Sequence, residues 1–141
     1  MAALAAEGVT DVLSMLPDDE AEEIGVGEEP AICAALGLRF HSHPIPDFCL
    51  PERHSFIARI ADILQMLGAG RHLAVHCRAG IGRSGMIATA TLIGFGQSAE
   101  EAIARVAQAR GVSIPDTEEQ AGFIRDFEKH WAERSAQRTE L

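Results

Sequence analysis

The sequence predicts an α/β domain in which helices flank a central, mostly parallel β-sheet. Segments with strand character, at 8–16, 38–45 and 72–77, alternate along the chain with segments of helical periodicity. The chain has 141 residues, 47% of them hydrophobic, which is enough to build one core. No repeat or low-complexity stretch divides the sequence. We therefore expect a single domain over residues 1–141, with its sites at the carboxyl ends of the strands.

Each of the three expected strands has its own pattern. The first, "GVTDVLSML" (8–16), supplies several valines and leucines to a core. The second, "LRFHSHPI" (38–45), alternates apolar and polar residues, which is the period of a half-buried strand. The third, "HLAVHC" (72–77), is a short apolar run after a turn and is typical of a buried strand.

The segments between and after these strands have helical patterns. Residues 18–24 predict a short acidic helix, and residues 28–36 predict a second helix that Gly37 closes. From 52 to 67 apolar residues recur at helical spacing, until "GAG" ends the pattern. The helices expected after the third strand are 83–95, one that begins at Ser98 with Glu101 completing a capping box, and 117–134.

The charge balance limits the partners that the protein can bind. With 21 acidic and 12 basic residues, the net charge is −9, which argues against nucleic-acid or anionic-membrane binding. Acidic residues are concentrated in the stretch 18–29, and the charge run 18–23 is interpreted as a solvated helix face. In contrast, 71–83 contains three arginines and no acid. We therefore expect a local positive pocket in a negative molecule.

Cysteine and histidine usage favours neither disulfides nor a metal. The three cysteines Cys33, Cys49 and Cys77 have no CxxC spacing, so neither a disulfide framework nor a structural zinc site is expected. His41 and His43 fit alternating strand positions better than a metal pair. We expect no metal and no other cofactor. The sequence leaves the oligomeric state open.

The expected location is cytoplasmic. No apolar run approaches the roughly 18 residues that a bilayer-spanning helix needs. The first residues, "MAALAAEGVTDV", lack the basic region of a signal peptide and include Glu7.

The stretch "HCRAGIGRSG" (76–85) lies between the last expected strand and a helix, and it has the composition of an anion cradle. Backbone N–H groups in such a loop point inward, and the dipole of the following helix adds positive charge. Gly80 and Gly82 allow the backbone to curl around an anion. Arg83 supplies a planar fork that can bind two oxygens of a phosphate or sulfate.

Cys77 lies at the mouth of this cradle. Inward amides, a helix N-terminus and an arginine are expected to lower the pKa of its thiol, which would make it a nucleophilic thiolate. Ser84 could donate a hydrogen bond to the thiolate and ease its later departure. His76 is expected to brace the loop from beneath rather than to transfer a proton.

The stretch "HCRAGIGRSG" resembles the signature loop of the cysteine-dependent protein tyrosine and dual-specificity phosphatases, His-Cys-x-x-Gly-x-x-Arg-Ser/Thr-Gly. The chain's size and element order are similar to the compact dual-specificity branch. The resemblance implies a two-step reaction through a cysteinyl-phosphate, without a metal. It also implies a phosphate-binding loop composed of Arg78, Ala79, Gly80, Ile81, Gly82 and Arg83.

Such a reaction needs an acid to protonate the leaving oxygen. In the family this is an aspartate on a loop roughly thirty residues before the cysteine, and "PIPDFCLP" supplies Asp47 there. Glu52 is the alternative, although it fits the first turn of a helix better. "IPDTEEQ" (114–120) resembles a segment that brings a glutamine toward the phosphate to orient water. Gln120 fits that role, or it completes a capping box with Thr117.

The match to the family is incomplete at the N-terminus. Family members carry a further upstream stretch that adds strands to the sheet, so we expect these N-terminal edge strands to be missing or rebuilt. An unprotected edge could pair with another chain. Cys49, two residues after Asp47, could trap oxidised Cys77 as a disulfide.

The expected substrate is a phosphorylated protein or a small phosphate ester. A phosphotyrosyl protein or aryl phosphate ranks first and phosphoserine or phosphothreonine second. Inositol phospholipid ranks lower, because the loop lacks lysines. The alternatives are a non-catalytic phosphate-binding module and rhodanese-like sulfur transfer. Cys77, Arg83 and Asp47 together argue against the binding module. Asp47 and the Arg-Ser-Gly ending favour phosphate over sulfur chemistry.

Overall fold

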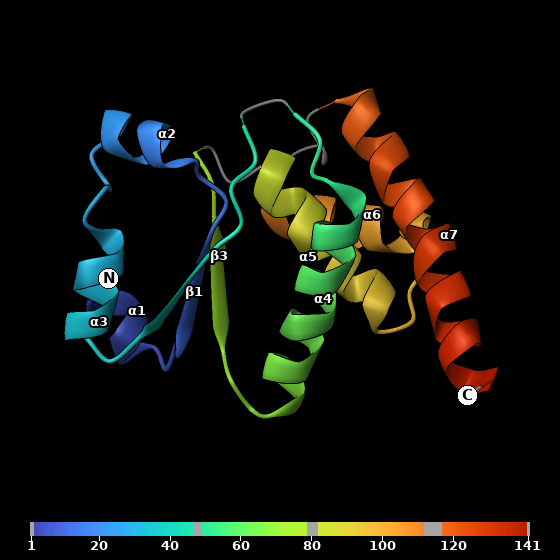
Figure 1. Cartoon of the computed structure of the whole chain (residues 1–141), viewed down its shortest axis with the longest axis horizontal. Helices are drawn as coiled ribbons and strands as arrows, with labels where there is room; N and C mark the ends of the chain where they lie inside the picture. Colours follow the sequence, from blue (N-terminus) through green and yellow to red (C-terminus); the bar gives the residue numbers. More distant parts are fainter. Residues whose placement is uncertain (1, 47–48, 79–81, 112–116, 141) are drawn as a thin grey trace.

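A computed structural model describes residues 2–46, 49–78, 82–111 and 117–140. Its sheet confirms the predicted α/β class. The strands are β1 (Asp11–Ser14), β2 (Arg39–Ser42) and β3 (Leu73–His76). They lie in the order β2-β1-β3, and both pairings are parallel (Figure 1).

The helices agree with the predicted segments at most positions. They are α1 (Ala2–Ala6), α2 (Asp18–Glu23), α3 (Glu29–Ala35), α4 (Arg53–Gly68), α5 (Gly82–Gly94), α6 (Ala99–Arg110) and α7 (Glu118–Glu140). The sequence did not predict α1, and α7 continues past its predicted end at 134. The predicted cap of α6 is confirmed, because the Ser98 hydroxyl accepts a hydrogen bond from the Glu101 N–H.

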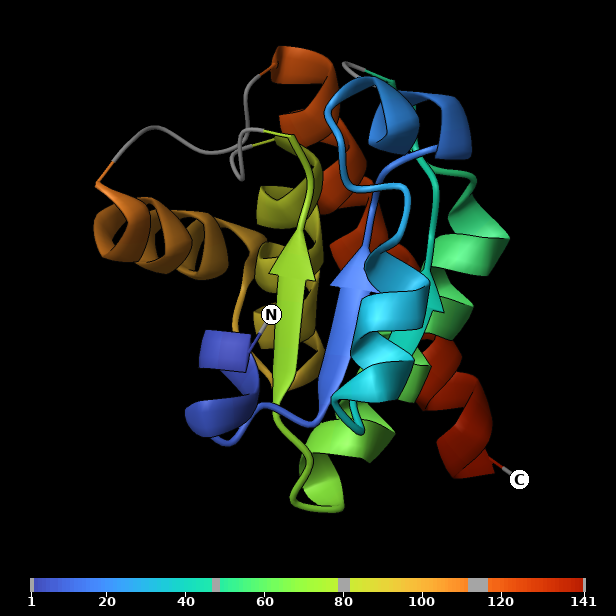
Figure 2. The same ribbon diagram turned by 90° about the vertical axis from the view of Figure 1, so that its left-hand side faces the viewer.

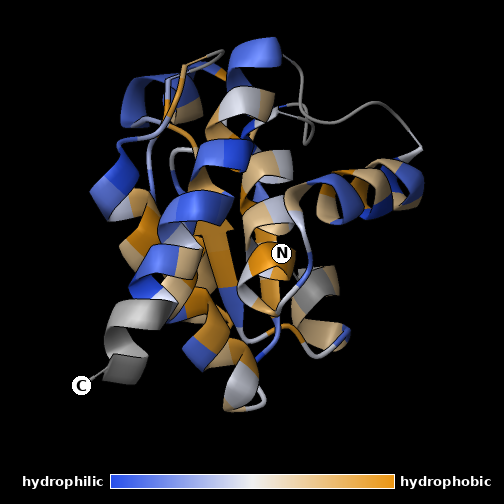
Figure 3. Ribbon diagram, turned by 90° about the vertical axis from the view of Figure 1, so that its right-hand side faces the viewer, coloured by the Kyte–Doolittle hydropathy of each residue, from blue (hydrophilic) through white to orange (hydrophobic). Residues whose placement is uncertain are grey.

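Two helical layers cover the sheet, because successive strand residues point to opposite faces. Val12 of β1 packs with Cys33 and Leu38 on the side of α1 and α3. Leu13 faces the larger core, which includes residues of α4, α5, α6 and α7. Figure 1 shows the sheet between these layers, and Figure 3 shows the hydrophobic strands behind α7, much of whose ribbon is hydrophilic.

The prediction that 72–77 forms a buried strand was only partly right. The residues of β3 are half-buried, whereas those of β1 are fully buried. The reason is position in the sheet: β1 has a neighbour on each side, and β3 pairs only with β1 among the described residues. Figure 2 shows β3 on one side of β1. The strand that precedes the signature loop is therefore held by one neighbouring strand.

Aromatic contacts fix α7 against α4. The ring of Phe56 lies 5.0 Å from that of Phe123 and 5.5 Å from that of Phe127, measured between centroids. Phe127 also stacks on Trp131 at 5.5 Å. These pairs contribute beyond the area they bury. They hold the start of α7, where Gln120 lies, in a fixed place on the core.

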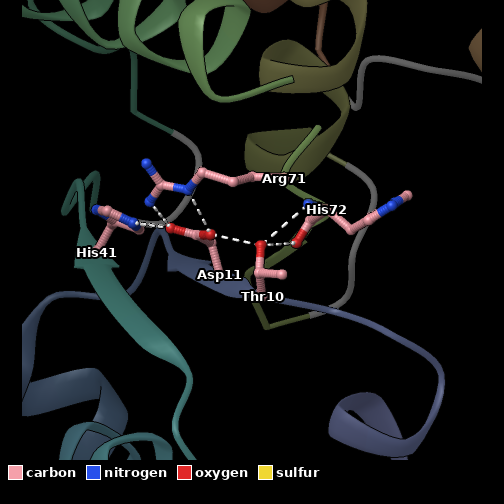
Figure 4. Close-up of polar contacts among 5 residues, drawn as sticks. All are labelled: Thr10, Asp11, His41, Arg71 and His72. Atoms are coloured by element: carbon pink, nitrogen blue, oxygen red, sulfur yellow. Dashed lines mark hydrogen bonds and ion pairs between the residues drawn. The ribbon is translucent and has the colours of Figure 1, made fainter. Parts of the chain in front are cut away.

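A buried carboxylate joins β1 to β2 and to the segment before β3 (Figure 4). Asp11 is completely buried at the start of β1. Arg71 forms two hydrogen bonds to it, from Nε at 3.0 Å and from a terminal nitrogen. The His41 Nε2 lies 2.7 Å from its Oδ2, and the Thr10 hydroxyl donates to its Oδ1 at 2.6 Å. Burial raises the pKa of the Asp11 carboxyl, but hydrogen bonds from Arg71, Thr10 and His41 outweigh burial and lower it well below its usual value.

We expect Asp11→Asn to lower the free energy of unfolding at pH 7 by about 3 kcal/mol, because it removes the charge of a completely buried carboxylate that accepts hydrogen bonds from Arg71 and Thr10. A carboxyl with a lowered native pKa stabilises the fold at pH values above its unfolded pKa of about 4, and this contribution is lost as the pH falls below that value. The difference between wild type and variant in urea unfolding should therefore shrink from pH 5 to pH 3. A difference that stays constant over this range would contradict the assignment.

Candidate active site

The predicted strand before the signature loop and the predicted helix after it are both present. β3 ends at His76, and α5 begins at Gly82. Between them, Cys77 is buried, with 8% of its surface exposed, and it belongs to the core on the α4–α5 side. Residues 79–81, which include the predicted phosphate-binding positions Ala79, Gly80 and Ile81, lie outside the described residues.

Arg83 is buried in the first turn of α5, with 2% of its surface exposed. Its two terminal nitrogens donate to the carboxylate of Glu20 at 2.7 and 3.0 Å. One of them also donates to the carbonyl oxygen of Ile45 at 2.9 Å. These contacts hold the guanidinium plane in one orientation, at the end of the sheet where α2 lies (Figure 2).

The Glu20–Arg83 pair changes the interpretation of the acidic stretch 18–29. The prediction of a solvated helix face was wrong for Glu20, whose side chain is 11% exposed. Hydrogen bonds from Arg83 lower the pKa of the Glu20 carboxyl. Also from this stretch, Glu23 lies 4.0 Å from Arg78. The sequence held a signal for this arrangement, because an acidic stretch and an acid-free basic stretch occur in one chain.

His76 is held by a third carboxylate from the same stretch. Its Nε2 lies 2.7 Å from the Oε1 of Glu29, the first residue of α3. The contact holds the His76 ring against α3, and the expectation that His76 braces the loop stays a prediction. Glu29 is a residue that the sequence interpretation missed.

Ser84 is positioned as a potential hydrogen-bond donor near the start of α5. It is buried, and its hydroxyl has no hydrogen-bond partner among the described residues. A buried hydroxyl without a partner is unfavourable unless some ligand or reacting group binds it. Its position directly after Arg83 is compatible with the predicted contact to the nucleophile.

The other predicted site residues have different outcomes. Asp47 lies outside the described residues. Glu52 caps α4, accepting hydrogen bonds from the N–H groups of His54 and Ser55, and these bonds lower the pKa of its carboxyl. These cap hydrogen bonds confirm the interpretation of Glu52 as a helix-start residue. The lowered pKa also makes Glu52 a poor proton donor.

Gln120 is buried in the first turn of α7, and its N–H donates to the Thr117 hydroxyl at 3.1 Å, which is half of the predicted capping box.

Of the two remaining cysteines, Cys49 is exposed, and Cys33 is buried on the α3 side. Burial, followed by the charge of Glu29, raises the pKa of the Cys33 thiol. This is the environment of a core cysteine.

Two broader features concern membranes and metals. None of the described helices is long and apolar enough to span a membrane. Within the described ranges, His, Cys, Asp and Glu side chains form no group of three or more that could hold a metal ion.

Comparison with known families identifies the fold. A family model described as "Polymorphic toxin system, DSP-PTPase phosphatase" matches residues 1–97. The chain belongs to this DSP-PTPase family. The membership confirms the resemblance drawn from the signature loop.

Curated relatives of the chain are found in mammals. Cyclin-dependent kinase inhibitor 3 of Rattus norvegicus is 26% identical over 126 residues, which cover 88% of the chain and 59% of the relative. The Homo sapiens protein is 25% identical over 122 residues, covering 85% and 58%. The chain thus spans less than two thirds of the length of these relatives.

Solved structures show the same fold. Kinase associated phosphatase with a serine at its catalytic cysteine has a TM-score of 0.85 at 24% identity, covering 92% of this chain and 74% of that one. PTPMT1 in complex with PI(5)P has a TM-score of 0.80 at 24% identity, covering 94% and 84%. Tyrosine phosphatase-like serine/threonine/tyrosine-interacting protein, from human, has a TM-score of 0.75 at 22% identity, covering 92% and 83%. These likenesses show that the chain has the fold of these proteins.

We expect Glu20→Gln to lower the free energy of unfolding by about 2 kcal/mol, because it leaves the buried Arg83 guanidinium without a charged partner. Glu23→Gln is the matched control from the same helix. Its pair with Arg78 is exposed, so no measurable loss is expected. Denaturant unfolding of both variants makes the comparison, and equal losses would show that burial of Arg83 does not depend on Glu20.

Proposed function

We propose that this DSP-PTPase hydrolyses phosphate monoesters through a cysteinyl-phosphate. The observation that carries the proposal is the position of Cys77 directly after β3 and of Arg83 in the first turn of α5. Both are buried, and Arg83 is held in one orientation by Glu20 and Ile45. A nucleophile beside a fixed guanidinium and a helix N-terminus is the arrangement that phosphoryl transfer requires.

In the first step, the Cys77 thiolate attacks phosphorus. An S–P bond forms while the ester P–O bond breaks, and the leaving oxygen takes a proton from Asp47. The backbone N–H groups of residues 78–83 and the positive charge of the Arg83 guanidinium stabilise the charge on the transferring group. The Glu20–Arg83 contacts support this role, because a guanidinium held in place needs no reorganisation during the reaction.

In the second step, water attacks the cysteinyl-phosphate. Asp47 takes the water's proton, the S–P bond breaks, and inorganic phosphate leaves the restored thiolate. Ser84 donates a hydrogen bond to the departing sulfur, a role that its buried hydroxyl supports. Gln120 orients the water. The reaction balances without an added oxidant, reductant or metal.

The proposed substrates are phosphorylated proteins and small phosphate esters. Phosphotyrosyl proteins and aryl phosphates rank first, and proteins with phosphoserine or phosphothreonine rank second. The proposed compartment is the cytoplasm, because a nucleophilic thiol has to remain reduced. A second candidate is a phosphate-binding module without turnover. We keep this candidate because a solved structure of the same fold is described as a tyrosine phosphatase-like interacting protein.

We expect the wild type to hydrolyse p-nitrophenyl phosphate with EDTA present throughout, and Cys77→Ser to lose the activity. Asp47→Asn should lower kcat by a factor on the order of 100. It should also remove the alkaline decline of kcat/KM between pH 4 and 9, because that decline reports the loss of the acid's proton.

Two outcomes of this experiment would contradict the proposal. Activity that survives in Cys77→Ser would exclude Cys77 as the nucleophile. A wild type that is inert, yet is protected by vanadate from alkylation at Cys77, would favour the phosphate-binding module.

A further inference from the structure

Glu29 is a nearly buried carboxylate to which the proposed reaction gives no role. It is 6% exposed at the start of α3, and its Oε1 lies 2.7 Å from the Nε2 of His76. Burying a carboxylate is costly unless hydrogen bonds satisfy it. The Glu29–His76 contact is therefore a built feature of the fold and differs in kind from the exposed ion pairs elsewhere on the surface.

The contact lies across the sheet from the sulfur of Cys77. In the parallel register His76 is the partner of Ser14, so its side chain points to the face that α3 covers. Cys77, one residue later, packs in the core on the opposite face, with residues of α4 and α5. Glu29 can therefore affect the nucleophile only by acting on the end of β3.

The backbone at the end of β3 is hydrogen-bonded to β1. The N–H of Met15 donates to the carbonyl oxygen of His76 at 2.9 Å, which holds the backbone against β1. In the part of the chain that the structure describes, β3 has no strand on its other side. The Glu29–His76 bond runs toward α3, out of the plane of the sheet. It supplies a second direction of restraint immediately before Cys77.

We propose that Glu29 is a positioning residue for Cys77: by holding the His76 ring against α3, it fixes the direction in which β3 delivers the sulfur to the N-terminus of α5. The carboxylate accepts the Nε2 hydrogen, which sets the tautomer and the orientation of the ring. Without it the ring can rotate, and the end of β3 loses its restraint on the α3 side of the sheet, while β1 and the core on the opposite face still hold it. This inference rests on the proposed role of Cys77 as nucleophile.

The effect should appear in the reactivity of Cys77, because a thiolate is stabilised at a helix N-terminus only when it is placed there. The arginines of the signature stretch already have carboxylate neighbours, and Asp18 and Glu22 line the same pocket as Glu29. Arg83 pairs with Glu20, and Arg78 lies 4.0 Å from Glu23. A variant at Glu29 leaves those pairs intact.

The experiment measures alkylation of each cysteine by iodoacetamide from pH 5 to 9, quantified by peptide mass spectrometry. Glu29→Ala removes the contact, and Glu29→Gln retains an acceptor without the charge. Glu28→Ala is the matched control, because Glu28 is the exposed neighbouring acid and its side chain forms no hydrogen bond to the helix start. Exposed Cys49 serves as an internal reference thiol.

We expect Glu29→Ala to raise the pH of half-maximal Cys77 alkylation by about one unit, with Glu29→Gln intermediate. Cys49 and the Glu28→Ala protein should remain unchanged. His76→Ala should cause a similar shift, and adding Glu29→Ala to it should cause none, because both remove the same contact. His76→Ala also tests the contact if Glu29→Ala does not fold.

Either of two results would overturn the inference: Cys77 profiles of the Glu29 variants that coincide with wild type, or a full Glu29→Ala shift in the His76→Ala background. Alkylation requires no turnover, so the outcome is separate from the proposed function. A shift in a protein that does not hydrolyse aryl phosphate would uphold Glu29 and reject the hydrolase. Normal hydrolysis without a shift would uphold the hydrolase and reject the positioning role of Glu29.

Discussion

The buried ion pair between Glu20 and Arg83 is the interaction on which the rest of the site depends. A guanidinium with 2% of its surface exposed needs a carboxylate partner, and α2 supplies one. The pair fixes α2 over the carboxyl end of the sheet and gives the first turn of α5 a rigid, oriented cation. The contact to the carbonyl oxygen of Ile45 joins the segment after β2 to the same point.

The acidic stretch 18–29 therefore belongs to the site. Its carboxylates contact all three basic or imidazole side chains of the signature stretch: Glu20 contacts Arg83, Glu23 lies near Arg78, and Glu29 contacts His76. This explains how a chain of net charge −9 can hold the cationic side chains of the signature stretch in place. The cations are oriented by partners inside the chain, and the overall negative charge disfavours polyanionic partners such as nucleic acid.

The sequence predicted those features that depend on neighbouring residues. Alternation over 38–45 predicted β2, and the Ser98–Glu101 spacing predicted the start of α6. Cys77 and Arg83 followed from one ten-residue motif. The missed contacts join residues far apart in sequence: 63 positions separate Glu20 from Arg83, 47 separate Glu29 from His76, and 60 separate Asp11 from Arg71. No local pattern encodes such pairs. The exposure of β3 was missed for a similar reason, because strand order is a property of the whole sheet.

The most direct test of the central claim is to trap the phosphorylated intermediate. The protein is mixed with excess aryl phosphate and quenched in acid within one turnover, and its peptides are analysed by mass spectrometry. The account predicts one added phosphoryl group on the peptide that contains Cys77, absent from Cys77→Ser and increased in Asp47→Asn if hydrolysis of the intermediate needs that base. Turnover with a phosphoryl group on another residue, or with none on Cys77 at any quench time, would contradict it.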